Sequence, residues 1–119
     1  MRVFRGHSRP VPAPVVLAIG NFDGVHLGHA ALVKRLAQVA EAFDLAPMVL
    51  TFEPHPREFF APDSAPARLT TLREKLELLG ECGARQAMIC PFNAAFAALS
   101  ADEFIEQVLV RGCQVRHLI

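Results

Sequence analysis

The sequence lacks an excess of charge of either sign, because 12 Lys and Arg residues balance 12 Asp and Glu residues. No broad electrostatic field is available to gather nucleic acid or an anionic membrane, and we expect neither as a partner. No apolar run approaches the ~20 residues that span a bilayer, and the first residues lack the apolar stretch of a signal peptide. We therefore expect a cytoplasmic location, while the sequence indicates nothing about oligomeric state.

Cysteine is also scarce, and Cys82, Cys90 and Cys113 match neither a CxxC redox pair nor a zinc-knuckle spacing. We expect all three to be small buried apolar residues rather than reactive or metal-binding ones. What the chain has in quantity is apolar residues, at 52% of its 119 positions. That content and length predict one compact domain.

The first half of the chain has the pattern of a strand, a glycine-rich turn, a helix and a second strand. The apolar run Val15–Ile19 stops at Gly20, as expected of a strand that is covered on both faces. From Ala30 onward, apolar residues recur at the three-and-four spacing of an amphipathic helix. We expect that region to end at Pro47 and a strand to follow at Met48–Phe52, which gives a parallel βαβ unit. The apolar helix positions are Leu32, Val33, Leu36, Val39, Ala40 and Phe43.

Two proline-rich stretches flank this unit. We interpret Met1–Pro14 as an extended lead-in and Glu53–Arg68 as a long loop with aromatic content, because proline removes backbone donors.

The second half predicts two further helices and two further strands. Thr71 with Glu74 and Ser100 with Glu103 are capping boxes, which mark helix starts. The expected elements are a helix from Thr71 that ends at Gly80 or Gly83, a strand at Gln86–Pro91, a helix from Ser100 to Gly112 and a strand at Val115–Ile119. The fold class is therefore α/β with a parallel sheet and flanking helices, which we expect to be incomplete at its C-terminus because no helix follows the last strand.

The segment GNFDGVHLGH at residues 20–29 is the candidate site, since ligands of open α/β sheets bind beyond the carboxyl ends of strands. Gly20, Gly24 and Gly28 allow a phosphate to approach the backbone, and the next helix offers free N–H groups at its start. His26 and His29 lie three apart and can point to one side of the first helical turn. A zinc site would need further ligands, so we expect no protein metal site and favour a polyphosphate. The alternative is two surface histidines in a glycine turn.

This segment fits neither the GxxxxGK[ST] pattern of P-loop proteins nor the GxGxxG pattern of dinucleotide folds. Together with LTFEPHPREFF, LTTLREKLELL and FNAAFAALSADEFIEQVL, it resembles the FMN adenylyltransferase domain of bacterial bifunctional riboflavin kinase/FAD synthetases. The resemblance covers nearly the whole chain. It implies a Rossmann-like nucleotidyltransferase fold and the conversion of ATP and FMN, with Mg²⁺, to FAD and diphosphate.

The resemblance also implies residue roles, with His26 and His29 as catalytic contacts to the ATP phosphates. On the FMN side, the alternative to a flavin site is a loop that its prolines stiffen and that inserts Phe59 or Phe60 into the core. The implied nucleotide-binding residues are Gly20, Asn21, Phe22, Asp23, Gly24, His26, Gly28 and His29, and the implied flavin-binding residues are Pro54, His55, Pro56 and Phe60.

Two other functions stay open at this point. One is a different HxGH nucleotidyltransferase with another phosphate acceptor, and the other is an inactive nucleotide-binding fragment. Family members continue beyond a strand like the last one here and carry a separate riboflavin kinase domain. We therefore expect residues 1–119 to be a partial FMN adenylyltransferase domain without the riboflavin kinase domain.

Overall fold

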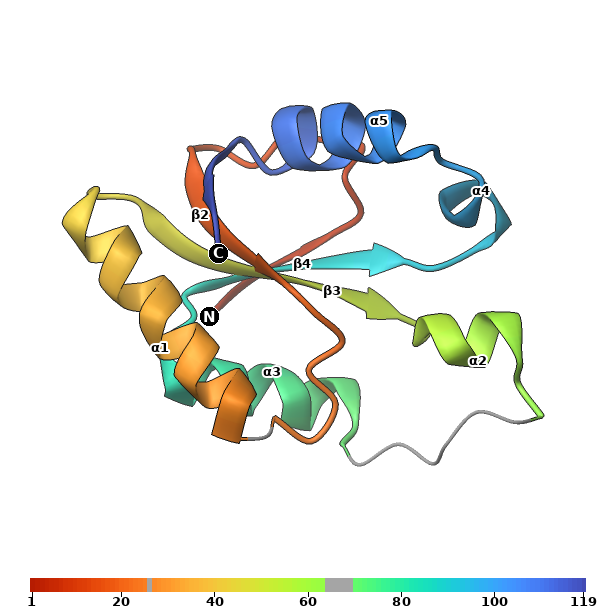
Figure 1. Cartoon of the computed structure of the whole chain (residues 1–119), viewed down its shortest axis with the longest axis horizontal. Coiled ribbons are helices and arrows are strands. Elements are labelled where there is room, and N and C mark those ends of the chain that lie inside the picture. Colours follow the sequence, from red (N-terminus) through yellow and green to blue (C-terminus); the bar gives the residue numbers. More distant parts are fainter. Residues whose placement is uncertain (26, 64–69) are drawn as a thin grey trace.

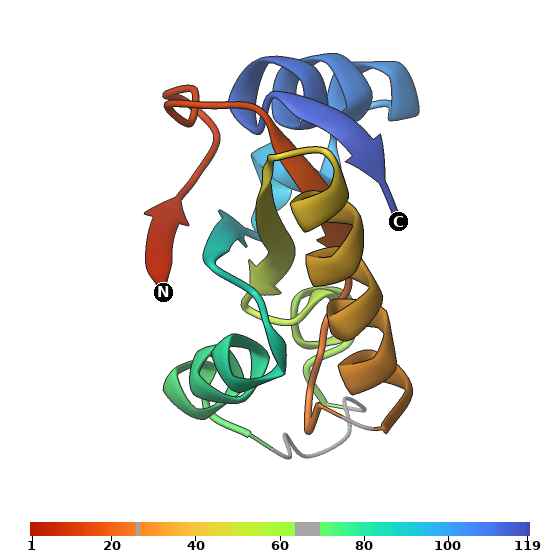
Figure 2. The same cartoon turned by 90° about the vertical axis from the view of Figure 1, so that its left-hand side faces the viewer.

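A five-stranded parallel sheet lies between two layers of helices (Figure 1). The computed structural model describes residues 1–25, 27–63 and 70–119. The strand order is β1-β4-β3-β2-β5, which confirms the predicted parallel α/β class and leaves β1 and β5 at opposite edges (Figure 2). The elements are β1 (Arg2–Arg5), β2 (Val15–Ile19), α1 (Leu27–Ala42), β3 (Ala46–Glu53), α2 (Pro56–Phe60), α3 (Leu72–Cys82), β4 (Gln86–Pro91), α4 (Ala94–Ala97), α5 (Ala101–Glu103), the π-helix η1 (Phe104–Gly112) and β5 (Val115–Leu118).

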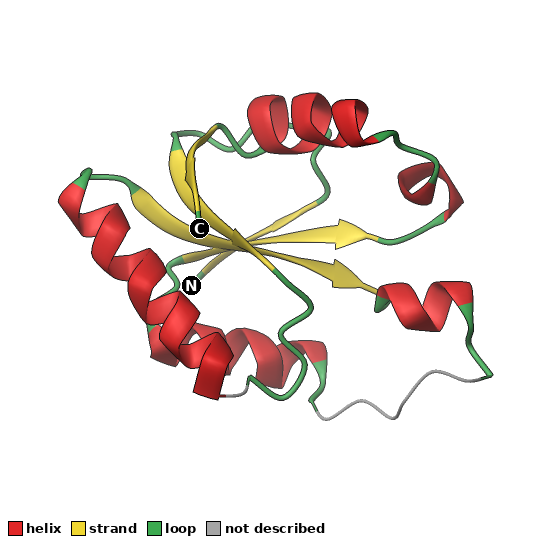
Figure 3. Cartoon of the chain, viewed as in Figure 1, coloured by secondary structure: helices red, strands yellow, loops and turns green. Residues whose placement is uncertain are grey.

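Helices cover both faces of the sheet: α1 and α3 lie on one face, and α5 and η1 lie on the other (Figure 3). Successive side chains of a strand point to opposite faces, so β2 contributes to two cores. Val16 and Ala18 pack toward α1, whereas Val15 and Leu17 pack toward η1, and all four are fully buried. Burial of each larger aliphatic side chain contributes about 1.5–3 kcal/mol, so both faces hold the strand in register.

The first helix differs from its prediction at both ends. It begins at Leu27 rather than near Ala30, and it ends at Ala42, well before Pro47. Asp44, with φ of 54°, turns the chain in the left-handed conformation that commonly ends helices. Pro47 instead lies in β3, where its carbonyl accepts a hydrogen bond from the Arg85 amide at 3.0 Å.

Both proline-rich stretches contain regular structure that was not predicted. The lead-in includes β1, a short edge strand paired with β4, and its prolines come only after that strand. The long loop includes α2, whose capping box joins His55 and Glu58 and whose first residue is Pro56. Proline suits that first position because its missing N–H would have no helical partner there. The last part of the predicted loop lies outside the described residues.

The second half follows its prediction closely. Both capping boxes are present, and Gly83, with φ of 122°, caps the end of α3. After Glu103 the last helix continues as the π-helix η1, which the apolar spacing cannot distinguish from an α-helix. Cys90 and Cys113 are buried as expected, but Cys82 is only half-buried. Within the described ranges, no helix is both long and apolar enough to cross a membrane.

Candidate functional site

The turn after β2 has an unusual backbone. It starts beside β3, where the Gly20 amide donates to the Leu50 carbonyl at 3.1 Å. Phe22, Gly24 and Val25 then have φ of 55°, 78° and 43°. Non-glycine residues adopt this left-handed region at a cost, so the surrounding structure must hold the turn in place.

One set of hydrogen bonds, here named the Asn21 network, holds the turn at its Asn21 carbonyl. This oxygen accepts from Lys75 Nζ at 2.9 Å and from Thr51 Oγ1 at 3.2 Å. Lys75 Nζ also donates to Thr51 Oγ1 at 3.0 Å. Thr51 is fully buried and Lys75 is 5% exposed, so these bonds are shielded from water. The network therefore connects the turn to β3 and to α3.

A second set of hydrogen bonds holds the turn further along the chain. Asp23 Oδ1 accepts from the Thr70 amide at 3.0 Å and from the Thr70 hydroxyl at 3.1 Å. The Gly24 amide donates to the same hydroxyl at 3.3 Å. Thr70 directly precedes the capping box that opens α3, so the start of α3 supports the turn at two separate points.

The side chain of Phe22 anchors the turn in the core. Its ring is 1% exposed and packs in the core on the α1 side of the sheet. A Cβ on Gly20 would lie 3.0 Å from the Phe22 ring, so packing favours glycine there. The Phe22 ring also meets the His29 ring edge-on, with centroids 5.4 Å apart. Any contact between Phe22 and a nucleotide would therefore have to come from its backbone.

The first turn of α1 is open and free of acidic side chains. Gly28 is exposed, and a Cβ added to it would meet no atom of the described residues within 4 Å. His29 is half-buried beside Phe22, and Leu27 is 91% exposed. His26, the other predicted catalytic histidine, lies outside the described residues. An open helix start that lacks carboxylates suits an anion.

A group of aromatic rings, here named the phenylalanine cluster, lies beyond the ends of β3 and β4. Its rings meet edge-on or tilted, with centroid separations of 5.2–6.0 Å. Within it Phe59 is 36% and Phe60 is 67% exposed, which contradicts the alternative that either ring is inserted into the core. The cluster consists of Phe52, Phe59, Phe60, Phe92, Phe96 and Phe104.

The other predicted flavin-binding residues lie where β3 runs into α2. Pro54 is exposed and directly follows β3, while His55 and Pro56 are half-buried at the start of α2. The Nδ1 atom of His55 accepts from the Arg57 amide at 3.1 Å, so this ring holds the helix cap. The structure thus gathers the predicted flavin-side residues beside the phenylalanine cluster.

The turn and the phenylalanine cluster meet at two consecutive residues of β3. Thr51 faces the α1 and α3 side and belongs to the Asn21 network, whereas Phe52 packs against the other core and belongs to the cluster. One residue step along a strand is only about 3.3 Å. Because the strands are parallel, the turn after β2 and the cluster around the ends of β3 and β4 lie at the same carboxyl end of the sheet.

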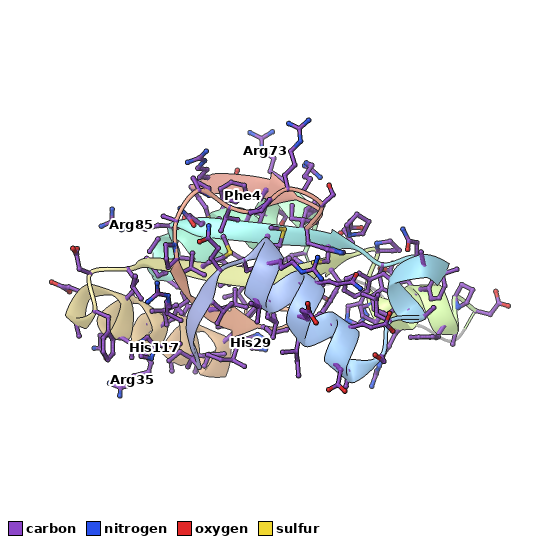
Figure 4. All side chains as sticks on the ribbon, turned by 90° about the horizontal axis from the view of Figure 1, so that it is seen from above. Phe4, His29, Arg35, Arg73, Arg85 and His117 are labelled. Atoms are coloured by element: carbon purple, nitrogen blue, oxygen red, sulfur yellow. The ribbon has the colours of Figure 1, made fainter. Side chains whose placement is uncertain are left out.

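A broad hollow of about 1120 Å³ lies elsewhere, between β1 and α3, and Arg2, Arg5, Arg73 and Arg85 are among its lining residues. Figure 4 shows Arg73 and Arg85 on the margin that carries Phe4, while His29 lies toward the opposite margin. These arginines are exposed, and the hollow lacks the constrained backbone of the turn. We therefore take the turn, rather than this larger hollow, as the candidate site.

After β2 the chain forms β3 and β4 on one side of this strand and then crosses over to place β5 on its other side. The carboxyl ends of β2 and β5 therefore form the switch point of the sheet. A constrained glycine turn at that point, followed by an open helix start, defines an α/β protein with a candidate anion site at the carboxyl end of its sheet. The family model described as FAD synthetase matches residues 8–119. The chain belongs to the FAD synthetase family.

Individual relatives agree with this assignment. The bifunctional riboflavin kinase/FMN adenylyltransferase of Escherichia coli (strain K12) is 48% identical over 121 residues, a match to 99% of this chain and 39% of that protein. The protein of the same name from Pseudomonas fluorescens is 43% identical over 120 residues, covering 99% of this chain and 38% of its own length. This chain therefore spans about two fifths of the length of these relatives.

A solved structure shares the fold. The crystal structure titled macrolide-efflux protein from Streptococcus pneumoniae superposes with a TM-score of 0.82 at 21% identity, covering 100% of this chain and 40% of that one. At this identity the likeness shows the fold alone, which is the expected parallel sheet with flanking helices.

Sequence reasoning missed the residues behind the turn, namely Thr51, Thr70 and Lys75. A signal was present for Lys75, because it falls between Leu72 and Leu79 on the apolar face of α3. A charged residue at a buried helix position needs a polar partner, which would have pointed to a network. Thr51 and Thr70 carry no comparable signal in the sequence.

Proposed function

We propose that this chain carries the FMN adenylyltransferase activity of its family, which converts ATP and FMN to FAD and diphosphate. The observation that carries the proposal is the junction at Thr51 and Phe52, where the glycine turn and the phenylalanine cluster meet on one strand. A transferase that joins two nucleotides needs two binding regions within reach of one bond. Membership of the FAD synthetase family supports the same reaction.

The turn and the start of α1 would bind the ATP phosphates. The helix start supplies free N–H groups and partial positive charge, and the open space at Gly28 allows a phosphate to approach the backbone. His29 would donate a hydrogen bond to the phosphates from its place beside Phe22. We extend this role to His26 and include Asn21, Asp23 and the turn glycines as shape-determining residues of the nucleotide site.

The phenylalanine cluster would bind the flavin ring of FMN. Exposed aromatic faces attract a flat, conjugated ring through stacking and apolar contact, and Phe60 is the most exposed member of the cluster. Pro54, His55 and Pro56 would form the adjoining wall of this site. The second substrate would then lie at the carboxyl end of β3, the same end of the sheet as the nucleotide turn.

In the reaction, a phosphate oxygen of FMN attacks the α-phosphorus of ATP, a new P–O bond forms, and the bond to the departing diphosphate breaks. Because the attacking group belongs to FMN, no protein nucleophile is needed. The protein contributes by aligning the two phosphates and by offsetting charge that develops on the departing oxygens.

We propose Mg²⁺ as the cofactor. Within the described ranges there is no group of three His, Cys, Asp or Glu side chains that could hold a metal ion. We expect the cation to arrive with the triphosphate, since Mg²⁺ at such sites keeps several waters and phosphate ligands. When bound, it would offset the negative charge of the phosphates. We place the reaction in the cytoplasm.

The test is FAD formation by this chain from ATP, Mg²⁺ and FMN, with the products separated and measured by chromatography. Riboflavin, 4′-phosphopantetheine and glycerol 3-phosphate serve as competing acceptors. We expect FAD from FMN and no adenylylated product from the other three. Product from another phosphate acceptor, or nucleotide binding without any turnover, would replace the proposal with one of the two other functions left open by the sequence.

A further inference from the structure

Lys75 is the most deeply buried charged side chain among the described residues, and the proposed reaction has not used it. It belongs to α3, outside the glycine turn, yet its ammonium group reaches the Asn21 carbonyl within that turn. Burying an ammonium group is costly unless hydrogen bonds compensate it, so its placement demands an explanation.

We propose that Lys75 is a positioning residue for the phosphate-binding turn, acting together with Thr51 through the Asn21 carbonyl. The proposal rests on the proposed function, because it takes the turn to be the triphosphate site. Lys75 does not contact the reacting atoms in this account. It acts through the backbone of residues 21–25.

The first argument concerns the direction of the Asn21 carbonyl. Two donors, Lys75 Nζ at 2.9 Å and Thr51 Oγ1 at 3.2 Å, draw this oxygen toward the sheet and α3. A carbonyl oxygen carries partial negative charge and would repel a phosphate if it faced one. Holding it inward keeps this partial negative charge away from an anion at the turn and the start of α1.

The second argument concerns strain. Phe22 and Val25 have φ of 55° and 43° without being glycine, so the turn relaxes unless something fixes it. The Asn21 network fixes the turn immediately before Phe22. Thr70 fixes it at Asp23 and Gly24, on the other side of Phe22. Loss of the network would remove the hydrogen bonds that tie the first half of the turn to β3 and α3 through the Asn21 carbonyl.

The test compares three variants. Lys75→Met keeps the length of the side chain and removes the charge and the donors. Thr51→Val keeps the shape of the side chain and removes the hydroxyl. Lys34→Met is the matched control, because Lys34 lies exposed on α1 and takes no part in the network. An apolar replacement of a buried charge often preserves stability, so the decisive readouts are binding and local exchange rather than melting temperature.

Binding is measured by calorimetry with inorganic triphosphate and Mg²⁺, and separately by quenching of FMN fluorescence. We expect Lys75→Met to raise the Kd for triphosphate by about tenfold to hundredfold, the typical effect of losing a hydrogen bond from a charged group. Thr51→Val should raise it less, and Lys34→Met should leave it unchanged. The Kd for FMN should stay constant in all three. Unchanged triphosphate binding by Lys75→Met, or equal loss of both ligands, would overturn the proposal.

Amide hydrogen exchange without ligand separates this inference from the proposed function. The Gly24 and Val25 amides are hydrogen-bonded in the turn, and we expect them to exchange faster in Lys75→Met, while the Met88 amide of β4 stays protected. If the native chain binds no triphosphate, the proposed function fails, but faster exchange at these two amides still supports the positioning role. Unchanged exchange there would overturn it.

Discussion

The glycine turn and the phenylalanine cluster occupy the same edge of the sheet, but they are held in different ways. The turn is fixed by partly buried hydrogen bonds from Thr51, Lys75 and Thr70. The cluster is held by ring contacts, and Phe59 and Phe60 remain exposed. One region is a constrained polar frame and the other is an adaptable apolar surface.

This difference matches the two tasks that the proposed reaction sets. A triphosphate must be aligned for in-line displacement, where small errors in position are costly, so a fixed frame suits it. A flavin ring is recognised through area and shape, for which partly exposed aromatic side chains are sufficient. Hydrogen bonds to a fixed backbone therefore serve the reacting end, and ring contacts serve the end that only has to be bound.

The largest effect should come from the phosphate side. We expect His29→Ala to lower the rate of FAD formation by roughly 10²- to 10³-fold, since it removes a donor aimed at developing charge. Circular dichroism should show an unchanged fold. His117→Ala is the matched control, because His117 also contacts a phenylalanine ring, that of Phe43 with centroids 4.0 Å apart, but takes no part in the proposed site. Equal rate losses in both variants would show that the effect is structural.

Gly28→Ala should have a smaller effect, which is to raise stability while weakening triphosphate binding. The added Cβ meets no atom of the described residues within 4 Å, and alanine is favoured over glycine in a helix by up to about 1 kcal/mol, so the free energy of unfolding should rise. We expect the Kd for triphosphate to rise by about tenfold, because the methyl group would occupy the space of a phosphate. Denaturant melts and calorimetry measure the two quantities.

Gly80→Ala is the control for that variant. Gly80 lies within α3, and a Cβ there would meet only the Met1 side chain, at an ordinary contact distance of 3.8 Å. It should gain similar stability without loss of affinity. If Gly28→Ala binds triphosphate as well as Gly80→Ala does, the open space at the start of α1 is not a phosphate site.

On the aromatic side, Phe60→Ala should raise the Kd for FMN by up to about tenfold, in line with the 0.5–1.5 kcal/mol of one aromatic pair. Stability should change little because the ring is largely exposed. Triphosphate affinity should be unaffected, which is the outcome that separates the two regions. The chain has no Trp or Tyr, so flavin fluorescence is read against a dark background, and Phe43→Ala provides an exposed-phenylalanine control.

The smallest effect concerns the buried core between the sheet and η1, which contains Cys90 and Cys113. Burial raises the pKa of the Cys90 thiol from 9.0 to about 12 and that of Cys113 to about 11. We expect a thiol reagent at pH 8 to modify half-buried Cys82 and to leave the other two intact. The stability contributed by the two neutral thiols is fully present below pH 9 and is lost as the pH rises toward 11–12. Labelling of all three thiols at pH 8 would show that this core opens readily to solvent.

The sequence predicted the parts of this fold that repeat a pattern. The apolar run of β2 and the capping boxes at Thr71 and Ser100 are local signals, and the structure has each of them where expected. β1 was missed because four residues at an edge carry too little periodicity. α2 was missed because the prolines that exclude a long helix are compatible with a short one.

The sequence indicated where the candidate site lies, but not the hydrogen bonds that hold its turn in place. Glycines after a buried strand indicate a phosphate turn from physics alone. The contacts that fix the turn join residues 30 and 54 positions apart in the sequence, Thr51 and Lys75 with Asn21. Only the folded chain brings such residues together, so no local pattern could predict the network.

The most direct test of the central claim is an NMR titration of the ¹⁵N-labelled chain, first with inorganic triphosphate and Mg²⁺ and then, separately, with FMN. The account predicts that triphosphate shifts the amides of residues 20–29, that FMN shifts those of Phe59, Phe60 and Phe92, and that both ligands affect Thr51 and Phe52. Triphosphate shifts centred on Arg2 and Arg85 in the hollow beside β1, or the same shifts with both ligands, would contradict it.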